Sequence, residues 1–107
     1  EAATKKDGPS AGAAMTLAIY SVLTGMKVNN YISMTGEIDL CMNVRPIGGV
    51  YAKLSGAKAA GIKLALIPKE NLKDLEILRN ENISPEDNEF KVELIETFRD
   101  VLKFSII

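Results

Sequence analysis

Hydrophobic and polar positions along the chain follow two periods, one typical of helices and one typical of strands. Residues 10–24 are small or apolar around the whole circumference of a helix, with Pro9 and Ser10 suited to its first turn and Gly25 suited to its end. We therefore expect a helix over residues 10–24 that neighbouring elements bury on both sides.

Shorter segments after Gly25 predict the remaining elements. Apolar residues at every second position of residues 37–45 predict one strand with Ile38, Leu40, Met42 and Val44 on one face. By the same criteria we expect strands over residues 31–35, 64–67 and 90–95, helices over residues 50–60, 70–79 and 98–104, and a loop over residues 80–89.

The order of these elements indicates the fold class. Residues 37–45, 50–60 and 64–67 make a β-α-β passage, and Gly61 is suited to end its helix. No internal repeat, low-complexity tract or linker divides the chain. The pattern predicts one compact α/β (α+β) domain over residues 1–107, with short strands and packed helices.

Composition and charge exclude two classes of partner. Thirteen basic and 14 acidic residues give a net charge of -1, and the lysines are scattered, so we expect no nucleic-acid partner. The longest apolar stretch, residues 11–23, is interrupted by Gly12, Thr16 and Ser21. It is too short and too polar to span a bilayer, so we expect no membrane partner.

The absence of histidine excludes much familiar hydrolytic chemistry. Among the 107 residues there is no histidine and one cysteine, Cys41, so this sequence contains neither a Ser-His-Asp triad nor a histidine-ligated or thiolate-cluster zinc site. We expect no metal site. Catalysis by this chain would have to use serine, threonine, lysine or carboxylates.

Ser10 is the first residue with a chemical role to consider. A serine at the start of a helix most often caps it, because its hydroxyl accepts a hydrogen bond from a free backbone N–H group. The alternative is a nucleophile whose oxyanion the helix N-terminus stabilises, with Gly8 and Gly12 allowing close approach of a substrate.

Lys53 occupies an unusual position in the predicted helix over residues 50–60. At 100° per residue, it falls within one apolar stripe with Val50, Leu54, Ala57 and Ala60. One interpretation is a lysine whose chain covers apolar surface while its ammonium stays in water. The other is a desolvated amine that acts as a neutral general base and forms a dyad with Ser10.

Four motifs resemble the proteolytic domain of Lon proteases. They are KDGPSAG at residues 6–12, MTGEI at residues 34–38, PIGG at residues 46–49 and AAGIKLALIPKEN at residues 59–71. They occur in the order of that family and extend over nearly the whole chain. The resemblance implies that the chain is the C-terminal part of this domain, with the family's earlier strands ahead of Glu1.

The same resemblance implies the roles of individual residues. Ser10 would be the nucleophile and Lys53 its partner. Thr35 would lie near the lysine and orient it, although a strand-end hydroxyl is the alternative. Asp7 would line the site, with a turn or capping carboxylate as the alternative, and Gly8 and Ala11 would support the site beside Ser10.

Some positions depart from the family pattern. After MTGEI the family typically continues with serine or threonine, then leucine and often Arg-Gly, whereas this chain has Asp39, Leu40, Cys41 and Met42. Lys5 replaces the usual proline, and residues 83–88 are particular to this chain. None of these changes alters Ser10 or Lys53.

At the level of the whole protein, the resemblance implies an ATP-dependent serine protease, a homo-hexamer that degrades unfolded or damaged proteins. No GxxxxGK[ST] motif occurs here, so we expect no cofactor in this chain, with ATP and Mg bound by an ATPase module elsewhere. Residues 92–104 resemble mitochondrial members more closely, which predicts the mitochondrial matrix, with bacterial cytoplasm as the alternative. The rival functions are a non-catalytic scaffold or assembly domain and an anion-binding module that uses the DGPSAG loop.

Overall fold

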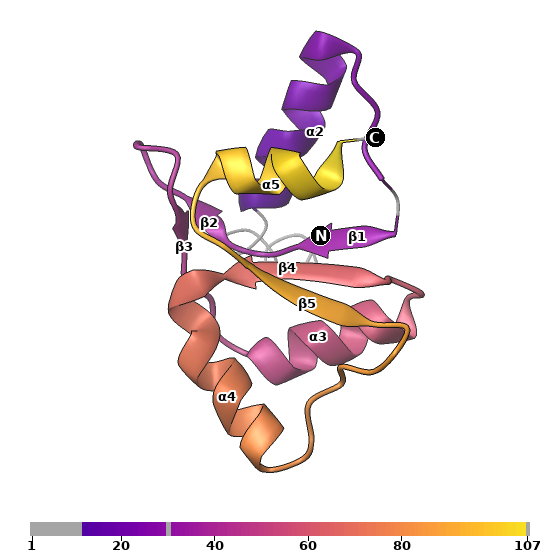
Figure 1. Ribbon diagram of the computed structural model, residues 1–107. Coiled ribbons are helices and arrows are strands. Elements are labelled where there is room, and N and C mark those ends of the chain that lie inside the picture. The colour runs from indigo at the N-terminus through magenta and orange to yellow at the C-terminus, as the bar shows by residue number, and fades with distance from the viewer. Residues whose placement is uncertain (1–11, 30, 107) are drawn as a thin grey trace, which may run out of the picture.

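A three-stranded parallel sheet separates two layers of helices (Figure 1). The computed structural model describes the backbone of residues 12–29 and 31–106 and the side chains of residues 16–29 and 31–106. The sheet has the order β1-β4-β5, with β1 at Ile32–Met34, β4 at Leu64–Pro68 and β5 at Lys91–Ile95. β4 pairs in parallel with both neighbours, Ser33 facing Ala65 and Leu66 facing Glu93.

The central strand β4 contributes to both cores because its side chains alternate between the faces of the sheet. Leu66 belongs to one hydrophobic cluster, and Ala65 and Ile67 belong to the other. These three residues are at most 2% exposed. Burial on both faces explains why this segment is a continuous apolar run and not an alternating one.

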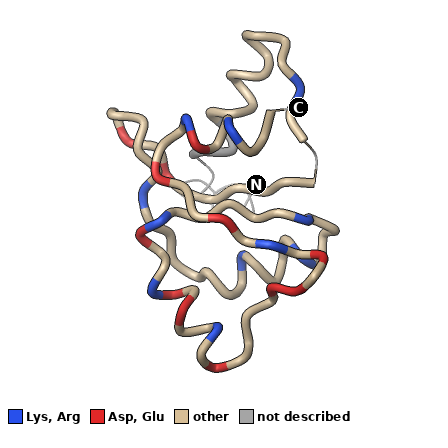
Figure 2. The backbone as a smooth tube through the Cα atoms, in the orientation of Figure 1, with Lys and Arg blue, Asp and Glu red and all other residues tan. Residues whose placement is uncertain are grey.

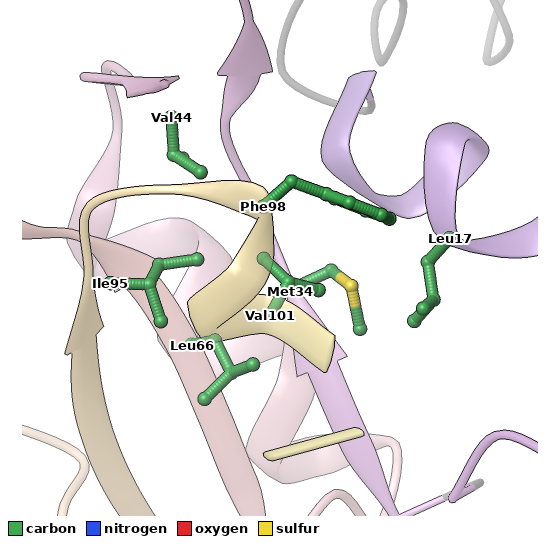
Figure 3. Packing of buried hydrophobic residues seen from close by; sticks show 7 residues of the cluster. All are labelled: Leu17, Met34, Val44, Leu66, Ile95, Phe98 and Val101. Carbon is green, nitrogen blue, oxygen red and sulfur yellow. The ribbon is translucent and has the colours of Figure 1, made fainter. Parts of the chain in front are cut away.

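Each face of the sheet is covered by a pair of helices (Figure 1). The α3 helix (Val50–Ala59) and the α4 helix (Leu72–Asn80) pack on the face that Ala65 and Ile67 line. On the other face, the α2 helix (Gly12–Thr24) and the α5 helix (Phe98–Ser105) cover Leu66. Figure 3 shows the second core, formed by Leu17, Met34, Val44, Leu66, Ile95, Phe98 and Val101. The predicted α/β class is confirmed.

The segment predicted as one strand, residues 37–45, is a hairpin, so that prediction is wrong. Its two strands, β2 (Glu37–Ile38) and β3 (Val44–Arg45), pair antiparallel. Asp39 causes the reversal, because its Oδ1 accepts hydrogen bonds from the backbone N–H groups of Cys41 (2.8 Å) and Asn43 (2.9 Å). These hydrogen bonds, chiefly that of Asn43, lower the pKa of Asp39.

The hairpin also changes the predicted β-α-β passage. β4 pairs with β1 and not with residues 37–45, so the parallel crossover runs from β1 through the hairpin and α3 to β4. The hairpin joins the end of β5 instead, where Val44 N donates to Glu96 O (2.8 Å) and Phe98 N donates to Met42 O (2.9 Å).

The other predicted elements are confirmed with small shifts at their ends. The α2 and α3 helices are followed by Gly25 (φ 75) and Gly61 (φ 87), as predicted. A 3₁₀ turn, η2 (Lys69–Asn71), precedes α4. Arg79, in the last turn of α4, donates two hydrogen bonds to Glu86 in the following loop (2.8 and 2.7 Å), which lower the pKa of that carboxyl.

The α2 helix is less covered than its apolar sequence predicts. Leu17 is 2% exposed, whereas Val22 and Leu23 are 82% and 79% exposed. Only one side of α2 meets the sheet and α5, and its C-terminal end projects away from them (Figure 1). Figure 2 shows acidic and basic residues interspersed on the other elements and none on α2. No described helix has the length and apolar character needed to cross a membrane.

Gly36 is required where β1 turns into the hairpin. Its φ is 143°, and an added Cβ would lie 2.4 Å from Val44 Cγ1 and 3.3 Å from Pro68 Cγ. Val44 is 4% exposed and belongs to the core, so it has no room to move.

Gly36→Ala should therefore lower the free energy of unfolding by about 2–5 kcal/mol, from core overpacking and backbone strain together. The measurement is denaturant unfolding of the full chain. Gly56→Ala is the control, because a Cβ there meets nothing within 4 Å. Since alanine favours the helix over glycine, this variant should raise the free energy of unfolding by ~0.5–1 kcal/mol. Equal stability of Gly36→Ala and the original chain would contradict this account.

Met42 is strained in the hairpin turn, because its φ is 65°, where a side chain is disfavoured and glycine is not. Met42→Gly should raise the free energy of unfolding by about 0.5–1 kcal/mol after the entropy of glycine in the unfolded chain is subtracted. Thermal unfolding of the full chain tests this. Cys41→Gly changes an exposed neighbour without positive φ, so it should lower the free energy of unfolding. If Met42→Gly lowers it as well, Met42 is not strained.

Candidate active site

The predicted nucleophile cannot be located from the structure. Ser10, Asp7, Gly8 and Ala11 all lie outside the described residues. The description of α2 begins at Gly12, two positions after Ser10. The predicted roles of these four residues therefore stay predictions.

Lys53 lies in the first turn of α3, at the margin of its buried face. Its backbone N–H donates to Gly49 O (3.0 Å), and Gly49 precedes the helix in the left-handed conformation (φ 66). Val50 and Leu54 are buried, and Lys53 is half-buried. Within the described part of the chain Lys53 Nζ forms no ion pair, so no carboxylate there competes with a serine hydroxyl for it.

Thr35 lies directly after β1, where its backbone N–H donates to Leu66 O in β4 (3.1 Å). Its Oγ1 is shielded from solvent and forms no hydrogen bond with any described residue. A buried hydroxyl without a partner costs about 1–3 kcal/mol, so such groups usually have a functional or solvent partner. Thr35 and Lys53 are not hydrogen-bonded to each other here.

The segments that carry Thr35 and Lys53 nevertheless both contact β4. Thr35 is attached to β4 through the hydrogen bond with Leu66, and α3 packs Leu54 into the cluster that contains Ala65 and Ile67. The tightly packed sheet thus positions the backbone of both predicted residues.

A cavity of about 440 Å³ lies at the carboxyl ends of β4 and β5, where ligands often bind in parallel sheets. Ion pairs join its charged side chains, Arg45 to Glu70 (3.3 Å) and Lys69 to Glu96 (3.5 Å). Its lining is Asn43, Val44, Arg45, Lys69, Glu70, Ile95 and Glu96. The sequence analysis missed this site, although charged residues directly after two apolar strands were a visible signal.

The described side chains offer little to a metal ion. Among residues 16–29 and 31–106, no group of three or more cysteine, aspartate or glutamate residues is arranged to hold one. Cys41 is exposed on the hairpin turn. The described side chains include a half-buried lysine, Lys53, and a buried hydroxyl, that of Thr35, both of kinds that take part in proton transfer.

Comparisons with known proteins show the family to which the chain belongs. Residues 1–107 match the family model of the Lon protease (S16) C-terminal proteolytic domain. The Lon protease of Haemophilus influenzae is 48% identical over 106 residues, covering 99% of this chain and 13% of that protein. Those of Brucella suis and Lachnoclostridium phytofermentans are 47% and 46% identical, each covering 100% of this chain and 13% of the relative.

These relatives are all bacterial, so they give no support to the predicted mitochondrial matrix. The chain spans about 13% of the length of each. The match of the family model extends from residue 1 to residue 107 and includes all four motifs. The chain therefore belongs to the Lon protease C-terminal proteolytic domain family.

Proposed function

We propose that this chain supplies the catalytic residues of an ATP-dependent serine protease, with Ser10 as nucleophile and Lys53 as general base. The observation that carries the proposal is the family match over residues 1–107, which includes the DGPSAG motif around Ser10 and the PIGG motif before Lys53. The substrates are unfolded or damaged proteins.

The reaction is acyl transfer. The neutral amine of Lys53 accepts the hydroxyl proton of Ser10 as Oγ bonds to the carbonyl carbon of the scissile peptide. Backbone N–H groups at the helix start, at Ala11 and beside Gly8, hold the resulting oxyanion. The Lys53 ammonium then protonates the leaving amine of the substrate. In the second half of the reaction, the neutral Lys53 amine takes a proton from the water that attacks the acyl carbonyl, and it returns that proton to Ser10 Oγ as the carboxylic acid product leaves.

Two features of the described residues support this proposal. Lys53 is half-buried with no carboxylate partner in the described chain, so no carboxylate there competes with Ser10 for its amine. The buried Thr35 hydroxyl lacks a partner there and is suited to orient such an amine. Asp7 would line the site beside Ser10.

The remainder of the protein would supply what this chain lacks. In this proposal an ATPase module elsewhere on the polypeptide binds ATP and Mg, and six subunits form a ring. The bacterial relatives favour the bacterial cytoplasm over the mitochondrial matrix. Neither a scaffold role nor anion binding at the DGPSAG loop requires a reactive serine, so the following experiments separate them from catalysis.

A peptide boronate should bond covalently to Ser10 in the full-length protein, because boronates capture activated serine nucleophiles as tetrahedral adducts. Mass spectrometry locates the adduct, and Ser10→Ala is the control that should abolish it. An adduct on Ser21, Ser33 or Ser55 would reject the assignment. Absence of any adduct would favour the scaffold or the anion-binding function.

Lys53→Arg should lose peptide cleavage by roughly 10²- to 10⁴-fold, as expected for a missing general base, because arginine stays protonated. Lys53→Ala should be about equally inactive, while ATP hydrolysis and assembly persist. Lys58→Arg is the matched control on α3, because Lys58 is exposed and pairs with Asp87 at 2.7 Å. Near-normal cleavage by Lys53→Arg would show that Lys53 is only a structural cation.

A further inference from the structure

The side chain of Asn71 connects the start of α4 to the PIGG loop that precedes α3. Its Oδ1 accepts a hydrogen bond from Ile47 N (2.9 Å), and its Nδ2 donates to Ile47 O (2.8 Å). Nδ2 also donates to Asp74 Oδ2 (2.8 Å), which fixes the orientation of the amide. Asn71 is 2% exposed, so these hydrogen bonds are shielded from water.

This use of Asn71 differs from the usual role of asparagine at a helix start. Asn71 is the N-cap of α4, yet its side chain makes no capping hydrogen bond to that helix. Both polar atoms of its amide bind one residue of another segment instead. Two hydrogen bonds to the backbone of a single residue fix its orientation as well as its position.

The loop beyond Ile47 has few other restraints. A Cβ added at Gly48 or Gly49 would meet no heavy atom within 4 Å, so packing does not hold these residues. The ion pair between Arg45 and Glu70 joins the same two segments, but both side chains are about half exposed and such pairs contribute little. The buried amide of Asn71 therefore fixes the backbone of Ile47, whose side chain also packs against the cluster that contains Ala65 and Ile67.

The backbone that Asn71 holds is connected to Lys53, the predicted base, through Gly49. Gly49 follows Ile47 by two residues, and its carbonyl oxygen accepts the hydrogen bond of Lys53 N (3.0 Å). Val50 and Leu54 secure the same turn in the core. Because Val50 and Leu54 hold the helix in the core, a shift of Ile47 would act on Lys53 through Gly49 O, by displacing the acceptor of its backbone hydrogen bond.

We propose that Asn71 is a positioning residue for Lys53, which it places by holding Ile47 through both backbone polar groups. The inference rests on the proposed function, in which Lys53 is the general base. It assigns Asn71 no contact with the substrate. Loss of Asn71 should therefore reduce kcat and leave the KM for a peptide unchanged.

Asn71→Asp is the sharpest variant, because aspartate has nearly the same shape and keeps an acceptor for Ile47 N. It replaces the donor with an oxygen that faces Ile47 O and Asp74, so the loop must move. We expect kcat for peptide cleavage by the full-length protein to fall roughly 10- to 100-fold, the loss typical of a displaced catalytic group. The KM and ATP hydrolysis should not change.

Three controls separate positioning from stability. Leu78→Ala shortens a core residue of the same helix and lowers thermal stability without removing a hydrogen bond of Asn71 or Ile47, so its kcat should stay near the original. Asp74→Asn keeps an acceptor for Asn71 Nδ2 and should also be nearly unchanged. Asp74→Ala, at an exposed position, removes that acceptor and should lower kcat several-fold, which decides the question if Asn71→Asp does not fold.

The outcomes distinguish this inference from the proposed function. If kcat falls in Asn71→Asp or in Asp74→Ala but not in Leu78→Ala, and Lys53→Arg is inactive, the result supports both the positioning role of Asn71 and the dyad. Normal kcat in these two variants, or an equal fall in Leu78→Ala, overturns the positioning role and leaves the dyad intact. Activity of Lys53→Arg overturns the dyad and, with it, any role of Asn71 in placing the base.

Discussion

Burial of β4 on both of its faces is the constraint on which the rest of the structure depends. Leu66 faces α2 and α5, while Ala65 and Ile67 face α3 and α4. Because successive side chains alternate, a change of register by one residue would exchange the two cores. The strand also holds β1 and β5 at its edges, so the segment after β1 and the helix that contains Lys53 are positioned by the same five residues.

The elements predicted correctly from the sequence are those in which local signals and burial agree. α3 ends before Gly61 and α2 before Gly25, and β4 is a short apolar run on a two-sided buried strand. The single strand predicted over residues 37–45 was wrong, because the alternation of apolar residues there does not show where the chain reverses. Asp39 forms two backbone hydrogen bonds that reverse the chain, and Leu40 is fully exposed as a result.

Prediction of the candidate site was limited in a different way. The helical period placed Lys53 beside Val50 and Leu54, and the structure shows it half-buried at the margin of that face. Ser10 lies outside the described residues, so the dyad itself stays a prediction. The cavity at the carboxyl ends of β4 and β5 depends on which strands are neighbours, and this long-range pairing is absent from local sequence signals.

The motifs shared with Lon proteases contain two kinds of residue, and physical chemistry separates them. Ser10 and Thr35, like Lys53 shortly after the PIGG motif, offer groups that can exchange or orient a proton. Gly36 and Asn71 offer none, yet both have a geometric reason for their presence in this fold. A Cβ at Gly36 would collide with Val44, and the Asn71 amide satisfies both polar groups of Ile47. In the proposed mechanism, a motif residue without reactive chemistry would still bear on catalysis, because the geometry that it imposes decides where the reactive groups lie.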